Sequence, residues 1–223
     1  MTVVVYWKGK LATDRMISVD RVGKGVVGKY SNEKIRLFDE HSPYLFNGKR
    51  IRAIAVAGTI RYLDEILMEI VDVNSTVGRE VQYDLLKYFK IRKEGGGKYP
   101  VTTWVLTDHL FRINWNVLRC TTYEEEKQHS TILIGEPGDT TLPFETIRWC
   151  QSAEEVAWLY CGFSQQCGFG VDVLDCETGE VTYYPYPTET TRLNIRRTLL
   201  DNLDRFFVRP IREEEVEALV YEF

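Results

Sequence analysis

The first residues of the chain place a threonine directly behind a methionine, at the start of an apolar stretch. They read MTVVVYWKGKLATDR, with Thr2 at the beginning and Asp14 near the end. Threonine favours strands, so an ordinary strand residue is one interpretation of Thr2. The other is that removal of Met1 makes Thr2 the N-terminal residue, with its hydroxyl as a nucleophile and its own amine as the base. This stretch alone leaves both interpretations open.

A glycine-rich segment near the N-terminus matches the spacing of a phosphate-binding loop. Gly23, Gly28 and Lys29 satisfy the pattern G-x-x-x-x-G-K. Such a loop also needs Ser or Thr at the next position and a helix directly after it. Here Tyr30 follows, and SNEKIRLF is typical of a turn and a strand, which provides no helix N-terminus for a phosphate. We therefore interpret the match as accidental.

The histidines and cysteines do not form the pattern of a metal site. His41, His109 and His129 are few and widely spaced, and no combination with a cysteine matches the usual zinc spacings. The number of cysteines is odd and no CxxC pair occurs, which predicts reduced thiols, some of them buried. These are Cys120, Cys150, Cys161, Cys167 and Cys176.

The composition indicates a folded protein with a sizeable core. Of the 223 residues, 44% are hydrophobic and 27% are charged, which is not the composition of a disordered chain. The net charge of -5 and the pI near 5.4 argue against nucleic acid as the main partner. No segment approaches the roughly 18 apolar residues of a membrane span, and MTVVVYWKGK is not a secretion signal. We expect no membrane association and a cytoplasmic location.

Hydrophobic periodicity in the first half predicts strands followed by two helices. Residues 2–14 predict a hairpin around KGK, and RVGKGVVGKYSN predicts a loop or an irregular hairpin. KIRLFD predicts a strand, EHSPYLFNGKR a turn, and IRAIAVAG a strand that is buried on both faces and ends at Gly58. Helices are predicted over residues 59–73 and over about residues 80–92.

The second half predicts strands, a helix, a hairpin and further helix. The predicted strands are YPVTTWVLTD, HLFRINWN and TILIGE, with RCTTYEEEKQHS as a polar excursion between the last two. Ser152 is a predicted N-cap for the helix SAEEVAWLYCGF, and GVDVLDCETGEVTYYPYP predicts a hairpin around ETGE. Helix resumes in TETTRLNIRRTLLDNLDRFF and in the acidic REEEVEALVYEF. This order predicts an α+β fold in which two antiparallel sheets are covered by helices.

The order and spacing of several stretches resemble the proteasome-type N-terminal-nucleophile (Ntn) hydrolases, particularly their compact bacterial and phage-encoded versions. The resemblance covers about half of the chain and contains no single highly specific motif. It implies a four-layer αββα sandwich, with residues 1–223 forming one Ntn-hydrolase-like domain. The resembling stretches are MTVVVYWKGKLATDR, EKIRLF, IRAIAVAGTIRYLDEIL and SAEEVAWLYCGFSQQCGFGVDVLDCETG.

The resemblance also implies a site and a reaction. Thr2 matches the nucleophile of a threonine peptidase, which becomes active once Met1 is removed. Lys34, at the start of the third strand, would tune that nucleophile, and Asp14, at the end of the second strand, would orient Lys34. The backbone amide of Gly58 would stabilise the oxyanion. The implied substrate is a peptide or another amide, the implied assembly is a homo-oligomer, and no cofactor is implied.

Two positions depart from the pattern of this family. Ser164 stands where the family commonly carries an aspartate, and Glu136 stands where it carries a serine after glycine. Both family residues support the N-terminal amine and the surrounding water. Their replacement favours an alternative, a non-catalytic Ntn-fold protein that acts as a binder or scaffold. A non-peptide amidase on the same fold is a third interpretation, because substrate specificity depends on loops rather than on the fold.

Overall fold

A computed structural model describes residues 2–21, 25–58, 83–84, 101–115, 119–122, 144–162, 167–207 and 211–221. The chain divides into two compact units. One consists of Met1–Glu33 together with His129–Phe223, and the other of Lys34–Gln128. We call them the terminal unit and the central unit. The single domain over residues 1–223 stays a prediction.

The terminal unit contains a four-stranded antiparallel sheet with the order β1-β2-β13-β14. It joins the N-terminal hairpin to a hairpin from the last quarter of the chain, and both hairpins were expected from the sequence. In the first, the two-residue turn Lys8–Gly9 has positive φ at both positions, which suits the right-handed twist of the strands. The strands are β1 (Val4–Trp7), β2 (Lys10–Asp14), β13 (Val171–Asp175) and β14 (Val181–Tyr184).

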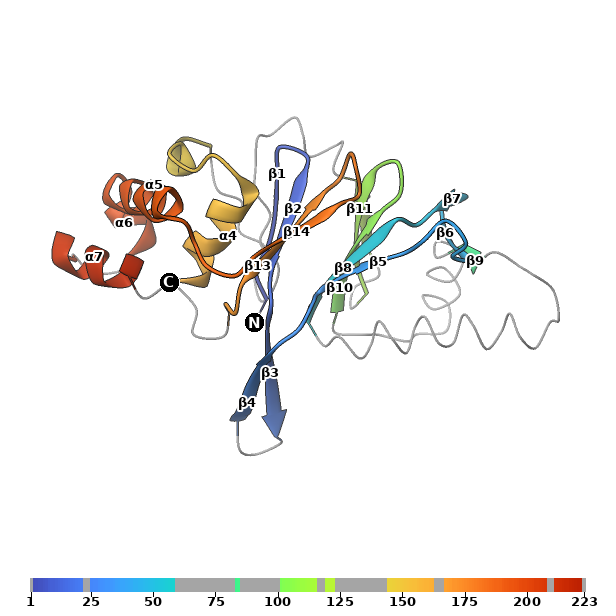
Figure 1. The fold of residues 1–223 in the computed structure, drawn as a ribbon, viewed down its shortest axis with the longest axis horizontal. Coiled ribbons are helices and arrows are strands. Elements are labelled where there is room, and N and C mark those ends of the chain that lie inside the picture. Colours follow the sequence, from blue (N-terminus) through green and yellow to red (C-terminus); the bar gives the residue numbers. More distant parts are fainter. Residues whose placement is uncertain are drawn as a thin grey trace. The chain divides into compact units, whose positions relative to one another are not determined.

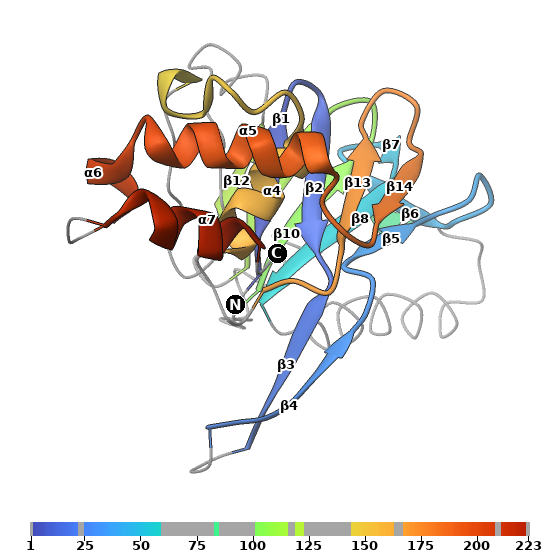
Figure 2. The ribbon, with the colours of Figure 1, turned by 60° about the vertical axis from the view of Figure 1, so that its left-hand side comes forward.

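Helices cover one face of this sheet in two layers (Figures 1 and 2). Helix α4 packs directly on β1, β2 and β13, α5 packs on α4, and α7 packs on α5. Ser152 caps α4 as predicted, because its hydroxyl accepts a hydrogen bond from the Glu155 N–H. The helices are α4 (Ala153–Cys161), α5 (Glu189–Leu200), α6 (Leu203–Phe206) and α7 (Glu213–Tyr221), with a 3-10 turn, η2 (Phe144–Ile147), before them.

A two-stranded ribbon leaves the end of β2 and extends away from the sheet of the terminal unit (Figure 2). It consists of β3 (Met16–Arg21) and β4 (Gly25–Ser31), and the register shifts between Val19 and Asp20. Of the two alternatives predicted for residues 21–32, a loop or an irregular hairpin, the structure shows the hairpin, and its first strand begins earlier than predicted, at Met16. Gly28 and Lys29 lie within β4, so they do not form a phosphate-binding loop.

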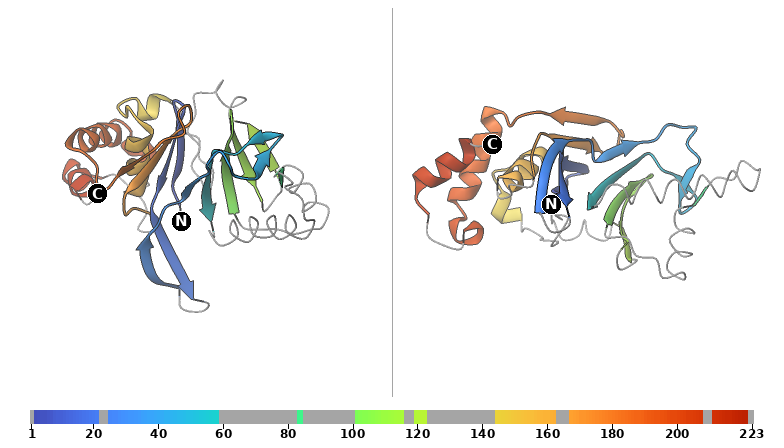
Figure 3. Two further views of the ribbon diagram at one scale, coloured as in Figure 1. Left: turned by 45° about the vertical axis from the view of Figure 1, so that its right-hand side comes forward. Right: turned by 90° about the horizontal axis from the view of Figure 1, so that it is seen from below.

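The central unit contains a five-stranded antiparallel sheet with the order β12-β11-β10-β8-β5 (Figure 3). Strand β8 is buried from Ala53 to Ala57, as its small apolar residues predict, and it ends at Gly58. The strands are β5 (Ile35–Leu37), β8 (Ala53–Gly58), β10 (Val101–Leu106), β11 (Leu110–Asn114) and β12 (Arg119–Thr122).

Three predictions for the central unit were wrong. The expected polar excursion begins with β12, an edge strand whose position depends on pairing with β11. The expected turn over residues 40–50 contains a small hairpin, β6 (Tyr44–Phe46) and β7 (Lys49–Arg50). The expected second helix contains β9 (Tyr83–Asp84), which pairs with β6 in parallel. The rest of that helix, the helix over residues 59–73 and the strand TILIGE lie outside the described residues.

The cysteines behave as predicted, and most of the tryptophans are buried. None of the five cysteines, all of which lie in the described residues, forms a disulfide bond, and Cys150, Cys161 and Cys167 are buried. Four tryptophans belong to the core, whereas Trp149 is 37% exposed and lies beside the guanidinium groups of Arg148 and Arg197. Among the described helices, none has the length and apolar character that a membrane crossing requires.

Candidate active site

The end of the chain that carries Thr2 is anchored to a buried carboxylate. Thr2 is 6% exposed and lies just before β1. The next backbone N–H, that of Val3, donates to Asp14 Oδ1 at 2.9 Å, and the Asp14 N–H donates back to the Val3 carbonyl at 3.3 Å. The structure therefore brings Asp14 to the residue adjoining Thr2.

Asp14 has no exposed surface and receives hydrogen bonds from three segments of the backbone. Besides Val3, the N–H groups of Met16 and Gly168 donate to its Oδ2, each at 3.2 Å. Removing a carboxylate from water is unfavourable unless hydrogen bonds or opposite charges compensate it. These donors provide such compensation, and hydrogen bonds to an ionised group are stronger than those between neutral groups.

The segment that supplies the Gly168 donor, Cys167–Gly170, has an unusual backbone, and we call it the clamp loop. Gly168, Phe169 and Gly170 have φ values of 133°, 60° and 101°. Glycine adopts such angles without a steric penalty, but phenylalanine does so at a cost. The Arg15 N–H donates to the carbonyls of both Gly168 and Gly170, at 3.0 and 3.1 Å. The clamp loop is thus bonded to Asp14 and to the residue after it.

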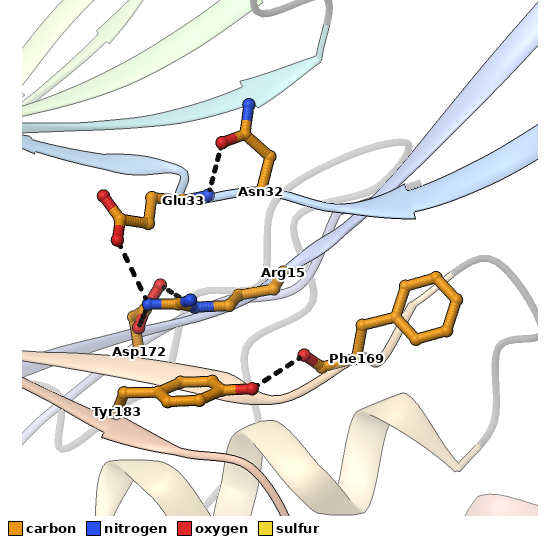
Figure 4. Close-up of polar contacts among 6 residues, drawn as sticks. All are labelled: Arg15, Asn32, Glu33, Phe169, Asp172 and Tyr183. Carbon is orange, nitrogen blue, oxygen red and sulfur yellow. Dashed lines mark hydrogen bonds and ion pairs between the residues drawn. The ribbon is translucent and has the colours of Figure 1, made fainter.

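The Arg15 side chain forms a polar cluster beside the clamp loop (Figure 4). Its Nε and Nη2 bind the two carboxylate oxygens of Asp172 at 2.8 and 2.7 Å, and its Nη2 lies 3.5 Å from Glu33. The guanidinium carbon lies 3.8 Å from the centre of the Tyr183 ring, and the Tyr183 hydroxyl donates to the Phe169 carbonyl at 3.4 Å.

The electrostatics of this cluster are those of a buried ion pair. The hydrogen bond to Asp172 raises the pKa of Arg15. Burial raises the pKa of Asp172, and the hydrogen bond from Arg15 offsets this rise only in part. Because the Asp172 side chain is 1% exposed, loss of Arg15 would leave a buried charge that water compensates poorly.

The two remaining predicted residues belong to the central unit. Lys34 does not start a third strand, because β3 and β4 intervene; it lies just before β5 and is 4% exposed. Its carbonyl accepts a hydrogen bond from the Val56 N–H at 3.0 Å, so the central unit places Lys34 beside β8, which ends at Gly58. Gly58 is exposed and has a φ of 102°.

Three residues that the sequence analysis singled out have no described position. Ser164, Glu136 and His129 lie outside the described residues. Within the described ranges, no group of three or more His, Cys, Asp or Glu side chains is placed to hold a metal ion.

Sequence reasoning missed Arg15 and Asp172. The available signal was an aspartate inside the apolar strand VDVLD, since a buried aspartate generally requires a cationic partner.

The arrangement of strands and helices defines the class of fold: it is that of the proteasome-like Ntn hydrolases, and the α+β prediction is confirmed. Anbu from Hyphomicrobium sp. strain MC1 is similar in structure, with a TM-score of 0.55 and 12% identity over 95% of this chain and 100% of that chain. Anbu, described as an ancestral beta-subunit, from Yersinia bercovieri has a TM-score of 0.50 and 12% identity over 95% of this chain and 99% of that chain. Comparison with models of protein families gives no match, and neither does comparison with curated proteins.

Proposed function

We propose that this protein is a proteasome-like threonine peptidase or amidohydrolase whose nucleophile is Thr2, exposed by removal of Met1. The observation that carries the proposal is the fully buried Asp14 carboxylate, which accepts the Val3 N–H next to Thr2. An ordinary strand end does not require a fully buried carboxyl group. An N-terminal nucleophile does need a fixed backbone, because small displacements of reacting atoms cost large factors in rate.

In the proposed reaction, Thr2 Oγ1 attacks the carbonyl carbon of the amide. The hydroxyl proton passes to the Thr2 amine, directly or through one water, and then to the departing amine as the C–N bond breaks. Water hydrolyses the resulting ester and restores the hydroxyl. We assign Lys34 to stabilise the alkoxide, Asp14 to orient Lys34, and the Gly58 N–H to stabilise the oxyanion, following the resemblance to the family. We also propose a homo-oligomer, which native mass spectrometry would detect.

Intact mass measurement with an electrophile tests the proposal. A β-lactone acylates a reactive hydroxyl by opening its ring, so the adduct carries the full mass of the lactone and the ring oxygen leaves as a hydroxyl. We expect the wild-type protein to lack Met1 and to gain one adduct, which peptide mapping places on Thr2. Thr2→Ser should keep the adduct, whereas Thr2→Ala should lose it. Thr182→Ala removes an exposed threonine from the same sheet and should leave the labelling unchanged.

The Lys34→Ala variant distinguishes the removal of Met1 from the reactivity of Thr2. Met1 should still be removed in this variant, because the residue that follows it is unchanged, but labelling of Thr2 should fall at least about ten-fold. Retention of Met1 in the wild type, or an exposed Thr2 that does not react, would refute the hydrolase proposal. Such a result would favour the alternative, a non-catalytic Ntn-fold binding or scaffold protein.

A further inference from the structure

The side chain and backbone of Arg15 together hold all three residues of the clamp loop that have positive φ. The Arg15 N–H binds the carbonyls of Gly168 and Gly170. The remaining carbonyl, that of Phe169, accepts a hydrogen bond from Tyr183, whose ring stacks on the Arg15 guanidinium. An unfavourable backbone conformation such as that of Phe169 persists only where the surroundings over-determine it.

The clamp loop in turn is hydrogen-bonded to Asp14, which holds the backbone next to Thr2. Gly168 donates to Asp14 Oδ2, and Asp14 Oδ1 accepts from Val3, the residue after Thr2. The contacts therefore run without interruption from the Arg15–Asp172 pair, through the clamp loop and Asp14, to the backbone beside Thr2. Arg15 lies at one end of this series, and the backbone beside Thr2 lies at the other.

We propose that Arg15 is a positioning residue for the nucleophile. By pairing with Asp172 and stacking on Tyr183, it fixes the clamp loop so that Gly168 holds Asp14, and Asp14 holds the backbone beside Thr2. This inference rests on the proposed function of Thr2. Glu33 contributes little to it, because its side chain is 68% exposed and exposed ion pairs are weak.

A merely structural role is the competing explanation, since the Arg15–Asp172 pair also joins β2 to β13. A second ion pair between the same two strands provides the control. Lys10 and Asp175 lie opposite each other at the other end of this strand pair, with Nζ and Oδ2 3.0 Å apart. This pair joins the same strands at the end far from Asp14 and Val171, so Lys10→Gln perturbs the strand pairing away from the clamp loop.

Two readouts test the proposal in the full-length protein. The first is hydrogen exchange of the Gly168 and Val3 amides, followed by NMR without any substrate. The second is the labelling of Thr2 by the β-lactone, resolved into a maximal rate and a half-saturating concentration. We expect Asp172→Asn to speed exchange of the Gly168 amide at least about ten-fold and to slow the maximal labelling rate by a similar factor. The half-saturating concentration should change less than about two-fold.

Arg15→Lys is the second variant. It keeps the positive charge beside Asp172 but loses the bidentate geometry and the planar stack, so it should recover part of both effects. It also serves as the test if Asp172→Asn does not fold. Lys10→Gln should leave exchange and labelling unchanged. Protection of Gly168 that survives in both Arg15→Lys and Asp172→Asn would overturn the inference, as would lost protection with an unchanged labelling rate.

The two readouts distinguish failure of this inference from failure of the proposed function. If Thr2 of the wild type is not labelled, the proposed function fails, and a role in positioning a nucleophile fails with it. The exchange data then still decide whether Arg15 fixes the clamp loop. If Thr2 is labelled at the same rate in all variants, the proposed function stands and the role of Arg15 alone is refuted.

Discussion

The sharpest prediction about stability concerns Glu154. Burial raises the pKa of this acidic residue toward neutral pH. It lies in the first turn of α4 and is 7% exposed. Burial, with a further contribution from the adjacent charge of Glu155, raises the pKa of Glu154 from 4.5 to about 7. Glu155 itself accepts hydrogen bonds from the Gln151 N–H at 2.6 Å and from Asn194 Nδ2 at 3.0 Å.

The direction of the pH effect follows from proton binding. Between pH 4.5 and about 7, the folded protein retains a proton on Glu154 that the unfolded chain has released. The contribution of this residue to the free energy of unfolding therefore decreases as the pH rises through that range, and it is constant above it. At about 1.4 kcal/mol per pH unit, the full loss is roughly 3 kcal/mol.

Glu154→Gln removes this titration and keeps the shape of the side chain. We expect the variant to match the wild type near pH 5 and to be more stable by about 2 to 3 kcal/mol at pH 8, as measured by urea unfolding at a fixed protein concentration. Glu214→Gln is the matched control, because Glu214 lies in the first turn of α7 but is exposed. It should change the stability by less than about 0.5 kcal/mol. An equal effect of Glu154→Gln at both pH values would refute the reasoning.

Two further predictions concern the terminal unit. Phe169→Gly removes a side chain that is 47% exposed from a position with a φ of 60°, and we expect a stabilisation of about 1 kcal/mol in urea unfolding. A destabilisation would indicate that the ring packs on something at that surface. Burial raises the pKa of the Cys150 thiol to about 12, so iodoacetamide at pH 8 should modify Cys150 much more slowly than Cys176, which is half-buried. Equal rates would contradict the burial of Cys150.

The parts of the fold that were predicted correctly are those determined by local sequence. The N-terminal hairpin follows from two apolar runs around a lysine–glycine turn, and α4 follows from its periodicity and the Ser152 cap. The end of β2 at Asp14 follows from the same hairpin. Each of these signals acts over a few residues, so the sequence carries it without reference to the rest of the chain.

The predictions that were wrong concern strands whose position depends on distant parts of the chain. Strand β9 is two residues long and exists because residues 83–84 pair with β6, some forty positions earlier in the chain. Strand β12 is placed by its pairing with β11, although its own residues are mostly polar. Such strands reflect tertiary context more than intrinsic preference, and a pattern of apolar residues does not indicate them.

At the candidate site, Asp14 and Arg15 show how local sequence and the pairing of distant strands combine. The position of Asp14 at the end of a hairpin was evident from the sequence, but its partner Gly168 and the pairing of Arg15 with Asp172 depend on the register of β2 against β13. That register places Val171 opposite Asp14 and Asp172 opposite Thr13. A shift by one residue would turn Asp172 to the other face of the sheet and separate it from Arg15. The geometry beside Thr2 is therefore a property of the assembled sheet, which explains why its anchoring, unlike the candidate nucleophile, had to be found in the structure.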